Sequence, residues 1–336
     1  MTVLFDLEFP NAREGIFVPQ GFATPHEVVD VVVRAEEFGF NAVWATDFFS
    51  PVASSGVITE PPPNWLEGLI TLSYAAARTS KIKLGTGVLM LPYRDPTVLA
   101  KQVATLDRLS NGRLLLGIGL GAYRDEFAAV RAHQASAHRG NMLDEYLELL
   151  IRLLDDNEAA VSLAGEYVSV EGVAMHPKPL QQPLPIYLPA RGDHAYKRIA
   201  RWGLMPMVPC ANPTAPIEAL RPFMEAAGKD MDALDIIVEG ELHIGPTQED
   251  AVKGYQHTTM GNFRTARCAP KARKSVETIT GANWVGTVDH IVEKLSGLRE
   301  QGFRHFNILH LATNTMAERL EQMQLFAEEI MPRVRT

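Results

Sequence analysis

The sequence predicts an α/β fold, a (β/α)8 barrel in which eight parallel strands close on themselves and helices surround them. The first observation is that short apolar runs alternate with amphipathic helical segments along 336 residues. The second is the composition, 46% hydrophobic and 21% charged, which suffices for a large buried core. The third is the lack of a linker rich in glycine, serine or proline, so we expect a single domain over residues 1–336.

Eight apolar runs supply the strands of the expected barrel. The run KIKLGTGVLMLP is the third, and its apolar and β-branched residues suit burial on both faces. The expected strands span 3–9, 41–47, 81–92, 114–121, 184–190, 204–209, 234–245 and 304–311.

At least one helical segment follows each strand, and the first has clear end signals. Thr24 suits the N-cap, Pro25 the first helical position, and Glu27 completes a capping box. Gly39 then suits the C-terminal cap. The helices are expected at 24–39, 65–80, 95–110, 139–156, between the strand at 184–190 and about 202, between the strand at 204–209 and about 228, and at 247–261, 287–302 and 316–334.

Two insertions, after strands 4 and 7, interrupt the alternation. The run AAVSLAGEYVSVEGV at 159–173 predicts a small hairpin outside the main sheet. Residues 262–285 are predicted to be irregular and polar, and they follow a strand, where barrels carry functional loops. We interpret 262–285 as a candidate active-site lid, whose five basic residues either attract an anionic substrate or solvate the loop.

The charge and the cysteine content exclude several classes of partner. The net charge is −8 and no basic run stands out, which argues against a nucleic acid or an anionic membrane surface. Cys210 and Cys268 offer no disulfide framework, so a reducing cytoplasm is expected, and no metal site is expected. The N-terminus lacks the basic start and long apolar core of a signal peptide, and no stretch approaches the ~18 uncharged apolar residues of a membrane helix.

The run LLLGIGLGAYRDEF raises the question of a dinucleotide site. That fingerprint needs G-x-G-x-x-G after the first strand of its unit, followed at once by a helix. Gly117, Gly119 and Gly121 are instead spaced G-x-G-x-G on the fourth strand. Two explanations stay open for them, and for Gly85 and Gly87 on the third strand. Small residues at a strand end let a flat ring approach the backbone, or they relieve crowding inside a narrow barrel.

The stretch LGTGVLMLPYRDPTVLAKQVATLDRLSNGRLLLGIGLG at 84–121 strongly resembles the luciferase-like flavin-dependent oxidoreductases. That superfamily includes bacterial luciferase, flavin-dependent monooxygenases and enzymes that use a deazaflavin coenzyme. The resemblance continues in the same order through 126–127, 139–150, 176–188 and 283–303. It implies a (β/α)8 barrel with an insertion and a flavin at the C-terminal mouth.

The resemblance also implies where a cofactor would lie. It places the isoalloxazine against the ends of the third and fourth strands, with a cis non-prolyl bond at or near Gly87–Val88. It places the phosphate after the fifth strand, at a glycine- and serine-containing turn before a helix N-terminus. Because Pro189 and Ala190 replace the common glycines, we expect Arg191 to contribute charge. The expected cofactor-binding residues are Gly85, Gly87, Val88, Leu89, Gly119, Leu120, Gly121, Ala190, Arg191 and Gly192.

One departure from the family pattern affects the chemistry. In the family the second strand often ends with an acid followed by a histidine that lines the reaction pocket. Here Asp47 keeps the acid, but Phe48 stands at the histidine position. Phenylalanine cannot transfer a proton. Either the reaction needs no base here, another residue supplies it, or catalysis has been lost.

Several residues are candidates for the missing function. His310 lies near the end of the eighth strand, on the same face as Phe306 and Ile308, so its side chain could point into the barrel mouth. The alternative is a structural histidine. Glu126 matches an acid beside the flavin in relatives, or it caps a loop. The expected catalytic residues are His310, Glu126 and Asp47. The expected substrate-pocket residues are Phe48, Trp65, Tyr123 and His138.

The leading hypothesis is a cytoplasmic monooxygenase that uses reduced FMN and O2 to insert one oxygen atom into a small organic substrate. A separate flavin reductase would supply the FMN, since no NAD-binding unit is visible in the sequence. The alternative is an oxidoreductase that transfers hydride with the deazaflavin coenzyme F-420. A non-catalytic flavin-binding relative is the third hypothesis, and the resemblance implies a homodimer in each case.

Overall fold

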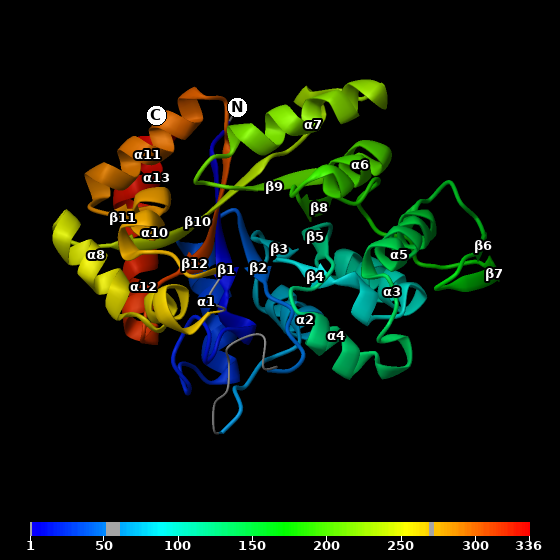
Figure 1. The fold of residues 1–336 in the computed structure, drawn as a ribbon, viewed down its shortest axis with the longest axis horizontal. Helices are drawn as coiled ribbons and strands as arrows, with labels where there is room; N and C mark the ends of the chain where they lie inside the picture. The colour runs from blue at the N-terminus through cyan, green and yellow to red at the C-terminus, as the bar shows by residue number, and fades with distance from the viewer. Residues whose placement is uncertain (1, 52–60, 269–271) are drawn as a thin grey trace.

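A closed barrel of eight parallel strands lies at the centre of the computed structural model, which describes residues 2–51, 61–268 and 272–336 (Figure 1). The strands pair in the order β1, β2, β3, β5, β8, β9, β10 and β12, and β12 pairs with β1 to close the ring. This arrangement confirms the predicted (β/α)8 fold. The barrel strands are β1 Leu4–Phe9, β2 Ala42–Ala45, β3 Lys83–Thr86, β5 Leu114–Gly119, β8 Ile186–Pro189, β9 Met205–Pro209, β10 Ile237–Ile244 and β12 His305–Leu311.

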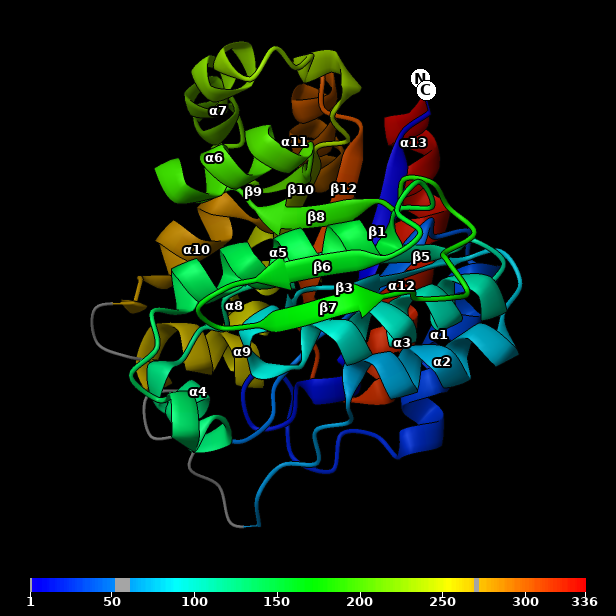
Figure 2. The same ribbon diagram turned by 90° about the vertical axis from the view of Figure 1, so that its right-hand side faces the viewer.

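Four further short strands lie outside this ring. β4, Leu89–Met90, pairs with β5, and β11, Trp284–Gly286, pairs with β10. β6, Val161–Ala164, and β7, Ser169–Val173, form the predicted antiparallel hairpin. The hairpin lies over α5 at the periphery of the molecule (Figure 2).

Helices surround the barrel and begin at the predicted signals. The capping box is present, because the Glu27 backbone N–H donates to Thr24 Oγ1 at 3.3 Å and the Thr24 N–H donates to Glu27 Oε2 at 2.8 Å. No helix in the ranges that the structure describes is long and apolar enough to cross a membrane. The helices are α1 Pro25–Glu37, α2 Gly68–Arg78, α3 Pro96–Leu109, α4 Arg124–Val130, α5 Arg139–Leu154, α6 Asp193–Trp202, α7 Thr214–Ala226, α8 Gln248–His257, α9 Thr259–Asn262, α10 Val276–Ala282, α11 Val288–Glu300, α12 Met316–Leu325 and α13 Met331–Arg335.

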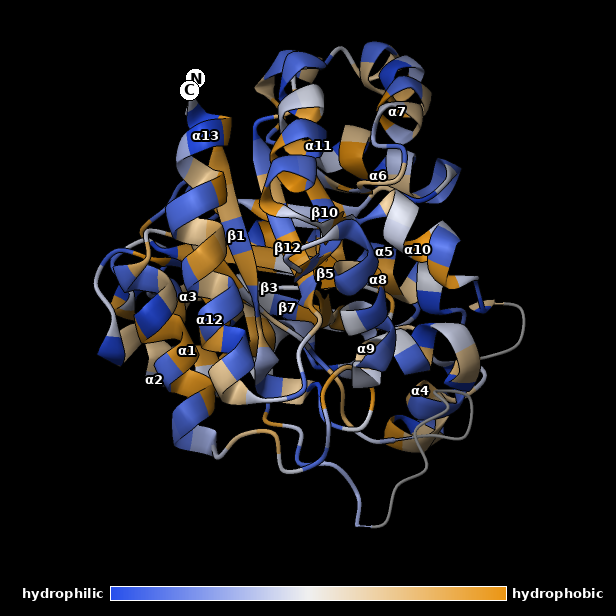
Figure 3. Cartoon of the chain, turned by 90° about the vertical axis from the view of Figure 1, so that its left-hand side faces the viewer, coloured by the Kyte–Doolittle hydropathy of each residue, from blue (hydrophilic) through white to orange (hydrophobic). Residues whose placement is uncertain are grey.

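The apolar residues form an outer and an inner layer. The main core fills the space between the strands and the helices, which turn apolar faces inward and polar faces outward (Figure 3). A smaller cluster fills the barrel itself, and it consists of Ala42, Trp44, Leu115, Tyr187, Met207 and Ile237. The barrel is therefore packed rather than hollow, as strands with large inward side chains require.

The structure corrects one prediction and refines another. Residues 262–285 are not irregular, because they contain a π-helical turn at Phe263–Arg267 together with α10 and β11; residues 269–271 lie outside the described part. The buried side chains of Phe263, Ile279 and Trp284 explain this order. The predicted strand at 81–92 is divided into β3 and β4, and the Gly87–Val88 peptide between them is cis, as predicted.

The amino-terminal half of the barrel interior holds a polar network around His305. Its Nε2 lies 2.7 Å from Asp6 Oδ2, and its Nδ1 lies 2.9 Å from Asp235 Oδ2. The Trp44 Nε1–H also donates to Asp6, and the Tyr187 hydroxyl donates to Asp235. Burial alone would lower the pKa of His305, but the two carboxylates outweigh it and raise that pKa to about 10. His305 is therefore a protonated imidazolium that bridges two acids.

We predict that His305→Gln lowers the free energy of unfolding by about 3 kcal/mol or more at pH 6.5, because it leaves the buried Asp6 without its cation. The pKa of His305 is raised by folding, so its contribution is complete below the unfolded value near 6.5 and is lost as the pH rises toward 10. Denaturant unfolding at several pH values measures this difference between the variant and the wild type.

The control is His133→Gln, which changes an exposed histidine on the turn at Ala132–Gln134. It should unfold like the wild type at every pH. A difference in the free energy of unfolding between the wild type and His305→Gln that stays constant from pH 6.5 to 10 would contradict the bridging imidazolium.

Candidate functional site

The carboxyl ends of the barrel strands form a mouth with aromatic side chains on its loops. Phe17 follows β1, Phe48 and Trp65 follow β2, Tyr123 follows β5, and Phe263 follows β10. The ring centroid of Phe48 lies 5.3 Å from that of Trp65 and 6.4 Å from that of Tyr123. Three of the four predicted substrate-pocket residues therefore adjoin one another. They make an apolar wall of the kind that excludes water from a reacting centre.

The fourth predicted pocket residue, His138, has a different environment. It is exposed and is the N-cap of α5, where its Nδ1 accepts a hydrogen bond from the Asn141 backbone N–H at 3.2 Å. The structure explains His138 by helix capping and does not join its ring to the aromatic wall.

Both carboxylate oxygens of Asp47 accept hydrogen bonds from neighbouring groups. Arg94 donates from Nη1 to Oδ2 at 2.6 Å and from Nη2 to Oδ1 at 2.8 Å, and the Met90 N–H donates to Oδ2 at 2.8 Å. Burial raises the pKa of Asp47, although Arg94 opposes that change. These contacts fix β4, which begins just after the cis peptide, against the end of β2. They show a positioning function for this predicted catalytic residue and leave little of the carboxylate for a substrate.

Glu126 is a fully buried carboxyl on α4 that holds the loop after β2. Its Oε1 accepts hydrogen bonds from the backbone N–H groups of Phe49 at 2.9 Å and Ser50 at 3.3 Å. Burial raises the pKa of Glu126 in spite of these two donors. The loop-capping alternative thus describes its contacts, and these contacts fix the residues that follow Phe48.

His310 reaches the mouth for a reason that the sequence did not reveal. Phe306 and Ile308, whose parity it was expected to share, pack outward in the main core. The pairing of β10 with β12 shifts at Gly240 and Glu241, so that Leu309 is an extra residue and His310 turns inward.

The His310 ring is enclosed by a guanidinium and an aromatic ring. Its Nδ1 lies 2.7 Å from Arg13 Nη1, and its centroid lies 4.0 Å from that of Phe17. Burial, with the charge of Arg13 beside it, lowers the pKa of His310 to about 3. The ring is therefore neutral near pH 7, and since Arg13 can only donate, Nδ1 accepts and Nε2 carries the proton.

A buried carboxylate, Glu8, organises the charges beneath this ring. Its Oε1 accepts from Arg319 Nη2 at 2.6 Å and from the Leu311 N–H at 2.9 Å, and its Oε2 lies 3.3 Å from Arg13 Nε. Burial alone would raise the pKa of Glu8, but Arg319 and Arg13 hold it well below its usual value. Sequence reasoning missed these residues. The alternation of apolar and acidic residues in LFDLEF was the available signal, because every second residue of a barrel strand points inward.

A second interior carboxyl, Glu239 on β10, was also missed. It is register-paired with Asn307 on β12, whose Nδ2 donates to Glu239 Oε1 at 3.2 Å. Asn307 is fully buried, whereas Glu239 is half-buried. Burial raises the pKa of Glu239 to about 7, although Asn307, Arg191 and Arg13 oppose that change.

Packing within the protein accounts for several glycines of the third and fourth barrel strands. A Cβ on Gly85 would overlap the Trp44 ring, and one on Gly117 would overlap the Thr86 carbonyl oxygen. A Cβ on Gly119 would lie 2.8 Å from Val88. The explanation by crowding, which the sequence left open, therefore holds for these positions. Leu89, in β4, is buried and pairs with Ile118 of β5, and Leu120 is half-buried.

The turn after β8 is accessible at the positions expected to hold a phosphate. Ala190 is buried and its N–H donates to the Met207 carbonyl at 2.9 Å. Arg191 and Gly192 are exposed, and Gly192 has a φ of 77° with no atom within 4 Å of the point where a Cβ would lie. Gly192 is also the N-cap of α6. An exposed guanidinium beside a helix N-terminus fits a phosphate group in charge and in donor type.

Comparison with known proteins identifies the family. The profile of the luciferase-like monooxygenase family matches residues 9–305. The chain belongs to this family. The match spans the barrel from the end of β1 to the start of β12, so it includes both insertions and every predicted site residue except His310.

Two similar proteins and one solved structure are named for the coenzyme F420. The chain is 27% identical over 333 residues to an F420-dependent glucose-6-phosphate dehydrogenase of Nakamurella multipartita, covering 93% of each protein. It is 31% identical over 240 residues to the enzyme of the same name from Kineococcus radiotolerans, covering 70% of this chain and 68% of that one. A solved F420-dependent secondary alcohol dehydrogenase in complex with an F420-acetone adduct matches the whole fold with a TM-score of 0.78 at 20% identity, covering 100% of both chains.

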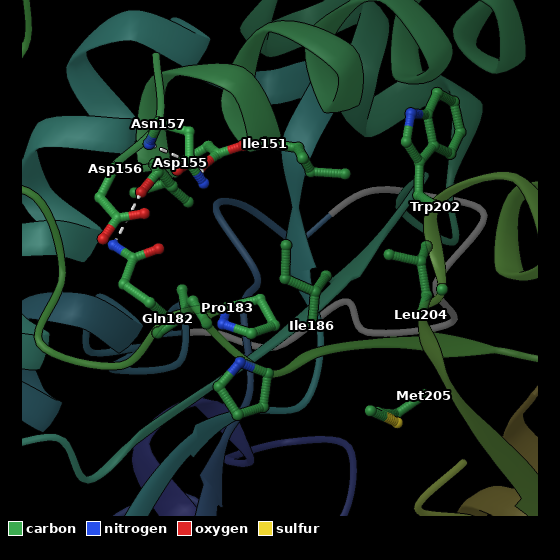
Figure 4. A pocket seen from close by; sticks show the side chains of 14 residues that line it. Ile151, Asp155, Asp156, Asn157, Gln182, Pro183, Ile186, Trp202, Leu204 and Met205 are labelled. Atoms are coloured by element: carbon green, nitrogen blue, oxygen red, sulfur yellow. Dashed lines mark hydrogen bonds between the residues drawn. The ribbon is translucent and has the colours of Figure 1, made fainter. Parts of the chain in front are cut away.

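A cleft of about 410 Å³ lies away from this mouth (Figure 4). Ile186, Leu204 and Met205 line it at the amino ends of β8 and β9, with Trp202 from the end of α6 and Asp155 from the end of α5. In the family barrel the predicted site residues lie at the opposite, carboxyl ends of the strands, so this cleft is not part of the candidate site.

We predict that the His310 imidazole does not titrate between pH 5 and 8, because its pKa is about 3 in the folded protein. Its 1H–13C NMR signal should keep the shift of a neutral ring with the proton on Nε2. A His310 midpoint above pH 5 would show that Arg13 does not hold the ring neutral.

Proposed function

We propose that this chain is an F420-dependent oxidoreductase that transfers a hydride between the deazaflavin coenzyme and a small hydroxylated or carbonyl substrate. The observation that carries the proposal is the relationship over 93% of both chains to an enzyme named for F420. It favours the alternative that the sequence left open over the hypothesis of reduced FMN and O2. The separate flavin reductase of that hypothesis is not required by a hydride transfer.

The residues at the mouth fit such a coenzyme. Arg191 and the free N–H groups at the start of α6 offer positive charge and donors to its phosphate. Val88 and Leu89 lie where the resemblance places the ring, beside the cis peptide. The coenzyme, when bound, supplies a centre that accepts or releases two electrons and one proton as hydride.

The chain's own residues would exclude water and orient the substrate. Phe48, Trp65 and Tyr123 form the apolar wall, and Glu126 fixes the loop from which Phe48 projects. Within the predicted lid at 262–285, the turn Phe263–Arg267 brings Phe263 and Arg264 to the Phe17 side of the mouth, and we retain this turn as the proposed lid. Closing such a site lowers the local dielectric and strengthens the polar contacts that remain inside it.

Coenzyme titration tests the proposal. We predict that F420 quenches the tryptophan fluorescence with a Kd at least about tenfold lower than that of reduced FMN, since each tenfold corresponds to about 1.4 kcal/mol. Arg191→Ala should weaken F420 binding by about tenfold or more, because a charge-assisted contact contributes roughly 1.5–3 kcal/mol. Lys197→Ala is the matched control, because Lys197 is an exposed cation one turn further along α6.

Substrate panels distinguish the remaining hypotheses. Bleaching of F420 by a secondary alcohol or a sugar phosphate supports hydride transfer. Tight binding of reduced FMN with coupled O2 consumption, and no binding of F420, would restore the monooxygenase hypothesis. Firm coenzyme binding with no turnover on either panel would favour the non-catalytic relative.

The homodimer expected from the resemblance also has a candidate surface. Ile70 and Tyr74 on α2 are 73% and 45% exposed, and Val98 and Leu109 on the adjacent α3 are 57% and 74% exposed. Exposed apolar side chains occur at interaction surfaces, and these four lie on two helices that contact each other. We propose that a second copy of the chain covers this surface.

We predict a dimer in size-exclusion chromatography with light scattering, and a monomer for the double variant Ile70→Lys and Leu109→Lys. The lysines introduce charges that an apolar interface cannot solvate. Ala219→Lys on the exposed face of α7 is the control and should remain dimeric. A wild type that elutes as a monomer at micromolar concentration would refute this assembly.

A further inference from the structure

Glu239 is placed inside the barrel, toward the mouth, by the alternation of β10. Two residues before it, Ile237 belongs to the cluster that fills the barrel. Two residues after it, Glu241 is bonded to Arg264 and Tyr255 at the level of the mouth loops. Glu239 therefore projects between the packed interior and the mouth, and it remains partly accessible there.

Glu239 differs from three other carboxyls of the mouth in its lack of a cation, and from Glu126, which is held by two backbone N–H groups, in not being fully buried. Asp47 is paired with Arg94, Glu8 with Arg319, and Glu241 with Arg264. Within the described ranges, no ion pair within 4.0 Å includes Glu239. A carboxyl that is enclosed but unpaired gains and releases a proton near neutral pH more readily than one fixed by a guanidinium.

Two charged groups act on Glu239 from a distance. Arg13 lies in the segment after β1, and Arg191 lies after β8; both favour the charged form. Asn307 on β12 is its direct contact, and the Cys210 N–H after β9 is bonded to the Glu239 backbone carbonyl rather than to its side chain.

Asn307 can hold Glu239 in either protonation state. Its Nδ2 donates to the carboxylate, while its Oδ1 is buried without a hydrogen-bond partner. An amide carries both donor and acceptor atoms, so a rotation by 180° would let Oδ1 accept from a protonated Glu239. A buried acceptor without a donor costs free energy, and this pairing satisfies it.

We propose that Glu239, positioned by Asn307, is the group that exchanges a proton with the substrate at the base of the mouth. This inference rests on the proposed F420-dependent function. It assigns to the barrel interior the proton transfer that the resemblance gives to the histidine at position 48. Phe48 cannot perform that transfer, and His310 is held neutral with Nδ1 occupied by Arg13.

In the proposed oxidation of an alcohol, the carbinol C–H bond would break, and its electron pair would leave with the hydrogen as hydride to F420. The hydroxyl O–H bond breaks, its proton moves to the Glu239 carboxylate, and the carbonyl C=O bond forms. Glu239 then releases the proton to water through the mouth, and the reverse sequence serves for reduction of the carbonyl.

The first experiment measures the proton on Glu239 without coenzyme. In protein labelled with 13C at the glutamate carboxyls, one signal should titrate with a midpoint near pH 7 and be missing from Glu239→Gln. Asn307→Leu should move that midpoint upward by about half a pH unit or more, because it removes the donor that favours the charged form. A wild-type midpoint below pH 5.5 would overturn the proposal.

A second readout of the same variant is its stability. The pKa of Glu239 is raised by folding, so the wild type loses stability as the pH rises from about 4.5 to 7, and Glu239→Gln should not lose it. A higher melting temperature of Glu239→Gln than of the wild type at pH 8 also shows that the variant folds. If the stability of the wild type and that of Glu239→Gln depend on pH in the same way, Glu239 is not an enclosed carboxyl that titrates near pH 7.

Steady-state kinetics with F420 and an alcohol then test the catalytic step. The wild-type kcat/KM should rise with pH through a midpoint near 7, and Glu239→Gln should lower kcat by about 100-fold or more and remove that rise. Glu158→Gln is the matched control, because Glu158 is paired with Arg152 before the β6–β7 hairpin. If Glu239→Gln binds F420 and its kcat/KM still rises with pH as in the wild type, only this inference is refuted. If the wild type does not bind F420, the proposed function and this inference are both refuted.

Discussion

Closure of the barrel depends on the contact between His305 of the last strand and the acids on either side of it. Asp6 belongs to the first strand, and Asp235 precedes β10, so the imidazolium joins the two sides of the seam where the chain's ends meet. Trp44 and Tyr187 donate to the same two carboxylates from β2 and β8. The network therefore links four barrel strands and the segment before a fifth. Buried charges of this kind are costly unless every one is paired, and here each has its partner.

Two carboxyls at the carboxyl ends of the barrel strands, Glu8 and Asp47, follow the same electrostatic rule, and Glu239 departs from it. Glu8 joins β1 to Arg319 on α12, and Asp47 joins β2 to Arg94 beyond β4, so guanidinium groups from outside the strands offset the interior acids. These pairs hold the loops that carry the aromatic wall. Glu239 is the departure, because its direct contact is an amide rather than a cation. Strongly paired carboxylates suit a scaffold, while a carboxyl whose two protonation states are close in free energy suits proton exchange.

The sequence could predict whatever depended on local pattern. The strand–helix alternation, the Thr24 capping box and the hairpin at 159–173 all appear in the structure, and so does the cis bond at Gly87–Val88, which the family resemblance implied. What it could not predict depended on partners distant in the chain or on register. Arg319 lies 311 positions from Glu8, and a single extra residue at Leu309 reverses the side on which His310 lies. The order within 262–285 was missed because the predominance of polar residues there concealed a few buried apolar ones, such as Phe263 and Ile279.

The replacement of histidine by phenylalanine at position 48 is consistent with the packing around it. Phe48 lies against the rings of Trp65 and Tyr123, so its apolar ring packs on aromatic surface. Because Phe48 cannot transfer a proton, the proposed transfer has to come from another residue, and the barrel interior holds titratable groups. Of these, His310 is fixed by Arg13 and Glu8 by two guanidinium groups, which leaves Glu239 as the group free to change its charge. The apolar wall and the unpaired interior carboxyl are thus two parts of one arrangement, in which the mouth excludes water while its base handles the proton.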